Sequence, residues 1–102
     1  MSDEVELGGN IGLTGFSDLD GSSMIVVKKI VGNYAKKFSE KCKKFERLTV
    51  TLKKVHEREK SEKYELHGRV MDGGKDYNAE ITDRNLFFAL DTVLKKLDKE
   101  IK

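Results

Sequence analysis

The longest regular pattern of apolar and polar positions covers residues 24–47. Its apolar residues recur at steps of three and four, so they share one side of an α-helix that is expected to end near Phe45. They are Val27, Val31, Tyr34, Phe38, Cys42 and Phe45. Ser22 or Ser23 is expected to cap the helix start with its hydroxyl. Gly32 inside the helix costs about 1 kcal/mol relative to alanine, a cost that close packing of the backbone against a sheet would explain.

Alternating apolar and polar residues predict four strands, and a second apolar stripe at steps of three and four predicts a second helix. The strands lie around residues 11–13, 48–53, 64–70 and 77–81, and the glycines of Asp72-Gly73-Gly74-Lys75 predict a hairpin between the last two. Residues 1–9 are expected to be frayed. Asp83 is the expected cap of the second helix, whose apolar stripe consists of Leu86, Leu90, Val93, Leu94, Leu97 and Ile101.

This order, β-α-β-β-β-α, predicts an α+β fold in a single domain of residues 1–102. The first helix is the crossover that lets the first strand lie parallel to the second, and the later strands pair antiparallel. Both helices then bury their stripes on one face of a four-stranded mixed sheet, as in double-stranded-RNA-binding domains. The other face is expected to show polar residues to water: Thr49, Thr51, Lys53, Glu65, His67, Arg69, Asn78 and Glu80.

The net charge of +2 hides an uneven distribution of charge. Residues 1–23 carry five carboxylates and no lysine or arginine, whereas residues 24–47 carry eight basic residues and two acidic ones. The basic residues face away from the apolar stripe, and such a local excess suits an anionic partner. The candidates on this segment are Lys28, Lys29, Lys36, Lys37, Lys43, Lys44 and Arg47. The alternative is a solvated face that only keeps the protein in solution.

Several classes of function lack support in the sequence. Cys42 and the two histidines match no metal-ligand spacing, and no nucleophile–base pair can be assembled, so we expect no enzyme, metal, cofactor or small-molecule substrate. Gly73-Gly74-Lys75 lacks the other residues of a phosphate-binding loop. The aromatic residues Tyr34, Phe38, Phe45, Phe87 and Phe88 are interpreted as core rather than as platforms for stacked bases. The lone cysteine, the acidic start and the lack of a long apolar run predict a cytoplasmic protein outside membranes.

Specific residues resemble the N-terminal domain of the ribosome hibernation-promoting factor family, also called ribosome-associated inhibitor or sigma-54 modulation proteins. The resemblance extends from about residue 11 to residue 101. It is carried by Ile11-Gly12-Leu13-Thr14-Gly15, the Gly73-Gly74 hairpin, residues 77–81, and the helix start Phe87, Ala89, Leu90-Asp91 with Lys96-Leu97. The chain departs from the family where Phe87 replaces a tyrosine, where Asn85 replaces an aspartate, and in the loop at residues 16–23, which is typical of a divergent branch.

The resemblance implies a non-enzymatic translation regulator of the stress response. Members of this family bind the small ribosomal subunit in the cleft used by mRNA and tRNA, and so silence or protect idle ribosomes in hibernation. It implies contacts of the helix lysines with rRNA, including Lys95, Lys96 and Lys99 of the second helix, where Asp91, Asp98 and Glu100 alternate with them. We expect the short form, a monomer without a dimerising tail. The alternatives are a general structured-RNA-binding module, or a protein–protein adaptor that uses the acidic N-terminus or the exposed sheet.

Overall fold

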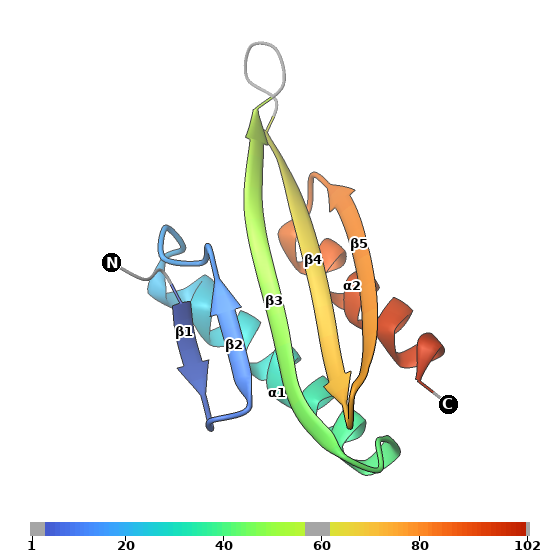
Figure 1. The fold of residues 1–102 in the computed structure, drawn as a ribbon. Helices are drawn as coiled ribbons and strands as arrows, with labels where there is room; N and C mark the ends of the chain where they lie inside the picture. Colours follow the sequence, from blue (N-terminus) through green and yellow to red (C-terminus); the bar gives the residue numbers. More distant parts are fainter. Residues whose placement is uncertain (1–3, 57–61, 102) are drawn as a thin grey trace.

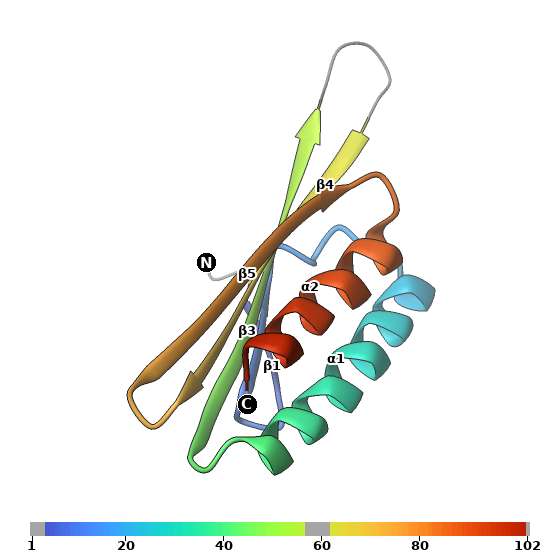
Figure 2. The same cartoon turned by 90° about the vertical axis from the view of Figure 1, so that its right-hand side faces the viewer.

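A five-stranded mixed sheet covered on one face by two helices forms the fold (Figures 1 and 2). The computed structural model describes residues 4–56 and 62–101. The elements are β1 (Glu4–Leu7), β2 (Ile11–Thr14), α1 (Gly21–Lys41), β3 (Phe45–His56), β4 (Glu62–Asp72), β5 (Lys75–Asp83) and α2 (Leu86–Glu100). The strands follow one another across the sheet in sequence order. The α+β class and the placement of both helices on one face agree with the sequence prediction.

The prediction of four strands is wrong, and residues 4–9 are not frayed, because residues 4–7 form the edge strand β1 and a turn follows it. The part of the prediction that concerns residues 1–3 lies outside the described residues. Strand β1 pairs antiparallel with β2, from Glu4 opposite Thr14 to Leu7 opposite Ile11. Gly8 and Gly9 take positive φ angles of 64° and 81° in the turn between them. Val5 and Leu7 pack against the core while the two glutamates are exposed. The strand therefore has the period-two pattern of a half-buried edge.

The crossover through α1 has the expected topology. β2 is parallel to β3, with Ile11 opposite Leu48 and Leu13 opposite Val50. The remaining neighbours, β3–β4 and β4–β5, are antiparallel, and Gly73 and Gly74 make the predicted hairpin turn with φ angles of 52° and 92°. The parallel pair requires a long connection, and α1 supplies it.

The ends of α1 differ from the prediction. The helix is capped by Asp20, whose carboxylate accepts the Ser23 N–H at 3.4 Å, rather than by a serine hydroxyl. It ends at Lys41 with Cys42 as its C-cap, so Phe45 begins β3 instead of closing the helix. The step of three from Cys42 to Phe45 fits a helix, but Phe45 also begins an alternating strand pattern. Without a glycine or proline as a stop signal, the periodicity alone extended the helix too far.

The cap of α2 lies two residues after the predicted Asp83. The side-chain oxygen of Asn85 accepts the Phe88 N–H at 3.0 Å, which makes Asn85 the cap. Asp83 instead accepts the N–H of Asn85 at 2.9 Å and so holds the capping residue in place. Asn is as good a capping residue as Asp, so this position caps the helix fully.

The core lies between the sheet and the two helices. Its largest fully buried side chains come from the loop before α1, from α1 itself, from the inner side of β2, β3 and β4, and from α2: Phe16, Phe38, Leu13, Leu48, Leu66, Leu90, Leu94, Leu97, Val27, Val31, Val50 and Val70. Gly68 of β4 lets α2 approach closely, since a Cβ there would lie 2.7 Å from Leu97 Cδ1. The explanation of Gly32 by close packing is wrong, because a Cβ on Gly32 would meet no atom within 4 Å.

Replacing Gly32 by alanine should therefore stabilise the protein. The new methyl group has open space, and alanine favours the helix over glycine by about 1 kcal/mol. Urea unfolding followed by circular dichroism should show a higher midpoint with an unchanged slope. The matched change Gly68→Ala should lower the midpoint because Leu97 would have to move. A loss of stability in Gly32→Ala would contradict this view of the helix surface.

Candidate nucleic-acid interface

Positive charge gathers on the side of the molecule formed by the two helices. From residue 21 to residue 44, α1 and the turn after it carry seven lysines and one carboxylate, Glu40. α2 adds three lysines and three carboxylates. Because the apolar stripes face the sheet, most of these charges point outward. We call the outward surface of α1, residues 42–44 and α2 the helix face.

Most of the predicted lysines on α1 lie on this face without an intramolecular counterion. Lys28, Lys29 and Lys36 are exposed and turn away from buried Val27 and Val31. In the part of the chain that the structure describes, none of these three lysines makes an ion pair within 4 Å, and neither does Lys43 or Lys44. Their ammonium groups are therefore available to an external anion.

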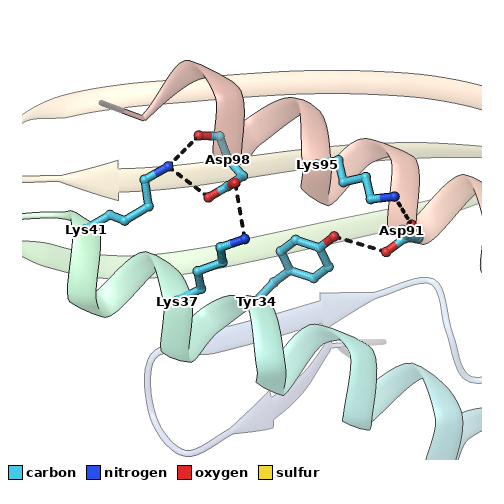
Figure 3. Close-up of polar contacts among 6 residues, drawn as sticks. All are labelled: Tyr34, Lys37, Lys41, Asp91, Lys95 and Asp98. Carbon is cyan, nitrogen blue, oxygen red and sulfur yellow. Dashed lines mark hydrogen bonds and ion pairs between the residues drawn. The ribbon is translucent and has the colours of Figure 1, made fainter.

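Two lysines of α1, Lys37 and Lys41, lie at the seam between the two helices (Figure 3). Lys41 Nζ lies 3.0 Å from Asp98 Oδ1, and Lys37 Nζ lies 3.4 Å from Asp98 Oδ2. The hydrogen bond from Lys41, with the nearby charges of Lys41 and Lys37, holds the pKa of Asp98 below its usual value. Within α1 itself, Glu40 is the one carboxylate available to neutralise the lysines. The carboxylate that pairs with Lys37 comes from α2 instead, so Lys37 is partly neutralised.

A second contact in the seam joins Tyr34 to α2. The Tyr34 hydroxyl donates to Asp91 Oδ1 at 3.0 Å, and Lys95 Nζ lies 3.1 Å from Asp91 Oδ2 (Figure 3). Desolvation and the bond to the Asp91 carboxylate raise the pKa of Tyr34 to about 12. The two carboxylates of α2 thus hold the helices side by side, and Lys95 is partly neutralised.

Beyond the end of α1, four lysines from three segments surround one cavity. It has a volume of about 430 Å³ and is lined by Lys41, Lys43, Lys44 and Lys75, together with Asp72, Gly73 and Tyr77. We call the four lysines the basic corner. Two hydrogen bonds fix its walls: the Lys44 N–H donates to Asp72 Oδ1 at 2.8 Å, and the Gly73 N–H donates to the Lys44 carbonyl at 3.0 Å.

The basic corner differs from the sequence prediction in two ways. Lys43 and Lys44 follow the helix instead of lying on it, which turns them toward the β4–β5 hairpin. Lys41 and Lys75 were not predicted as candidates. Lys75 belonged to a segment interpreted only as a turn, and nothing in the local pattern shows that this turn meets the end of α1. The tertiary fold makes the cluster.

Arg47 does not belong to the helix face. It lies on β3 with its side chain over Gly12, on the open side of the sheet. Its Nη2 lies 3.1 Å from Glu4 Oε2 and 2.8 Å from Glu6 Oε2. These two carboxylates belong to β1, the strand that was missed, so the pairing could not be predicted. Glu4 and Glu6 belong to the acidic N-terminal segment that was considered as a surface for a protein partner, and both pair with Arg47.

The lysines of α2 are divided between two directions. Lys95 and Lys99 are exposed on the helix face, while Lys96 donates to the Glu80 carbonyl at 3.1 Å. Lys96 and Lys99 also line a hollow of about 480 Å³ beside β5. Lys96 is therefore held toward the sheet edge.

The open side of the sheet has the predicted polar residues but no excess of positive charge. A shallow cavity of about 430 Å³ is lined there by Thr49, Thr51, His67, Arg69, Asn78 and Glu80, among others. His67 lies 2.6 Å from Glu65 and 3.3 Å from Glu80, and Arg69 pairs with Asp76. His67 and Arg69 are thus each in contact with carboxylates of the same side. Within residues 4–56 and 62–101, no group of three potential ligands is placed to hold a metal ion.

The interpretation of all five aromatic residues as core is wrong for two of them. Phe38 is buried and Tyr34 and Phe45 are partly buried, but Phe87 is 37% exposed and Phe88 is 58% exposed. Phe88 lies off the stripe of Leu86, Leu90 and Leu94, and this position was a signal in the sequence that it would face solvent. Phe87 has the spacing of the stripe, three residues before Leu90 and seven before Leu94, so the sequence carried no such signal for it.

Comparisons with known proteins provide no family for the chain. No family model matches its sequence, and no curated protein matches it either. Among the described residues, no helix is both long enough and apolar enough to cross a membrane.

The tyrosine in the seam gives a pH-dependent test of the helix packing. Since the pKa of Tyr34 is raised, the folded state favours the neutral phenol, and this contribution to stability is complete below pH 10. It should decline as the pH rises from 10 to about 12. In an absorbance titration at tyrosinate wavelengths, subtracting the Tyr34→Phe curve from that of the wild type should leave one transition near pH 12. A difference transition at pH 10 would mean that Tyr34 is not held against Asp91.

Proposed function

We propose that this protein binds structured RNA through its helix face and that the partner is the small ribosomal subunit, on which it acts as a non-enzymatic translation regulator. The observation that carries the proposal is the contrast between the two sides of the molecule. Unpaired lysines lie on the helix face and the basic corner adjoins its end, whereas the charged groups of the open sheet are largely in contact with one another.

Lysines without an internal counterion suit a polyphosphate partner. Each contact with a phosphate releases condensed counterions, so binding should weaken linearly on a logarithmic scale as salt rises. Such contacts hold orientation without reading base sequence. A rigid pair of helices with fixed lysines suits RNA, whose duplex segments are recognised mainly by shape and phosphate position.

The choice of the small ribosomal subunit depends on the family resemblance. It is supported by the order of elements from residue 11 to residue 101, which is the order that the resemblance implies, and by the retained cap at Asn85. The edge strand β1 is an addition to that order. The same lysines would also suit a general structured-RNA-binding module, so the experiment has to separate the two partners.

Salt-titrated co-sedimentation with purified small subunits tests the proposal. We expect wild-type protein to sediment with the subunits at low salt and to be released steeply as salt rises. Lys36→Glu should weaken binding and reduce the salt dependence by about one phosphate contact. The control Lys53→Glu makes the same change of charge on the open sheet and should have little effect. Both residues are exposed, so the fold should survive both changes.

Reversing four charges together sharpens the result. The variant with Lys36, Lys37, Lys43 and Lys44 changed to glutamate should no longer sediment with subunits while keeping its circular dichroism spectrum. If this variant still sediments fully, the helix face is not the binding site. Addition of free duplex RNA separates the partners: efficient competition would favour the general RNA-binding module over the ribosome.

A further inference from the structure

Four large apolar side chains are exposed at one end of the helix face. Ile25 and Val26 lie near the start of α1 and are 69% and 40% exposed, and Phe87 and Phe88 begin α2. The helices run side by side in the same direction, so both starts lie at the same end (Figure 2). This is the end of α1 opposite the basic corner, and it is separated from that corner by about 30 Å of helix.

An open cleft lies beside these residues. It has a volume of about 670 Å³, and its lining includes Asp18, Asp20, Lys54, Tyr64, Arg84 and Phe87. Its size is typical of small-ligand sites. Two of its walls are aromatic rings, those of Tyr64 and Phe87, and the more exposed ring of Phe88 follows directly in sequence.

Two cationic side chains beside the aromatic rings suit the phosphates of a nucleotide. Lys54 and Arg84 line the cleft, and neither makes an ion pair within the described part of the chain. Asp18 and Asp20 also line it, so its formal charges balance, and the Asp20 carboxylate accepts the Ser23 N–H. On the outward side, Phe88 shares a helical line with Lys95, seven residues on, so the aromatic surface continues into the basic helix face.

We propose that Phe87 and Phe88, neighbours on α2 whose rings point about 100° apart, form a stacking platform for successive unpaired RNA bases, with Lys54 and Arg84 of the cleft beside Phe87 holding a phosphate. This inference rests on the proposed RNA binding and adds to it a single-stranded segment as the ligand. Aromatic side chains stack on bases of any sequence, because every base has a π-face. The paired part of the RNA lies along the lysines of the helix face, and an unpaired end reaches the aromatic pair.

The test uses three RNA probes that share one hairpin: a blunt form, a form with a short adenosine overhang, and a form whose overhang is abasic. The two overhangs carry the same phosphates and differ only in the bases. Fluorescence anisotropy at fixed salt should show that the wild type binds the adenosine overhang about tenfold more tightly than the abasic one. Phe88→Ala should remove this difference and leave the affinity for the blunt hairpin unchanged.

Two matched variants make the result specific to the ring. Phe88→Tyr keeps an aromatic ring and should keep the preference for the adenosine overhang. Ile25→Ala removes another exposed apolar side chain from the same end and should also leave the preference intact. Because Phe88 is more than half exposed, Phe88→Ala should show the wild-type circular dichroism spectrum and melting temperature.

Different failures point to different conclusions. If the wild type binds the blunt hairpin but does not distinguish the two overhangs, or if Phe88→Ala distinguishes them as the wild type does, the stacking platform is wrong and the proposed function stands. If the wild type binds no RNA in a salt-dependent manner, the proposed function fails. A dimer in sedimentation velocity that Phe88→Ala dissociates would overturn the platform in favour of a second copy of the chain.

Discussion

Burial of both helix stripes against the same face of the sheet is the constraint on which the rest of the structure depends. A fully buried leucine or valine contributes about 1.5–3 kcal/mol, and buried leucines and valines from α1, α2 and the sheet supply most of this core. Once the stripes face inward, the lysines between them must face outward. Gly68 extends this constraint, because only a residue without a side chain lets Leu97 lie so close to β4.

Placing two lysine-bearing helices side by side concentrates like charges, and α2 supplies the compensation. Asp98 pairs with Lys37 and Lys41. Asp91 accepts a hydrogen bond from the Tyr34 hydroxyl and pairs with Lys95. These contacts neutralise the seam, including Lys41 of the basic corner, and leave the outer lysines and the other three lysines of the corner without an ion pair among the described residues. On the other side of the molecule, β1 brings Glu4 and Glu6 to Arg47. Although the net charge is only +2, the helix face is strongly positive and the charges of the open sheet are balanced. A positive surface of this kind suits a ligand with closely spaced phosphates.

The orientation of residues that follow a local periodicity could be predicted from the sequence. The contacts of residues whose partners are distant in the sequence could not. The steps from Val27 to Phe38 and from Leu86 to Leu97 determine which side of each helix is buried, and they also identified Lys28, Lys29 and Lys36 as outward residues. Arg47, Lys41 and Lys75 acquire their surroundings only when β1, α2 and the β4–β5 hairpin are in place. The exposure of Phe88 was within reach of the same periodicity, because this residue lies off the stripe.

The central claim is that the helix face, and not the open sheet, meets the ribosome. Lysine acetylation followed by mass spectrometry, with and without an excess of purified small subunits, measures this residue by residue in the unmodified protein. The account predicts that bound subunits protect Lys36, Lys43 and Lys44 from acetylation and leave Lys53 as reactive as in the free protein. Protection of Lys53 with unchanged reactivity at the other three would contradict it.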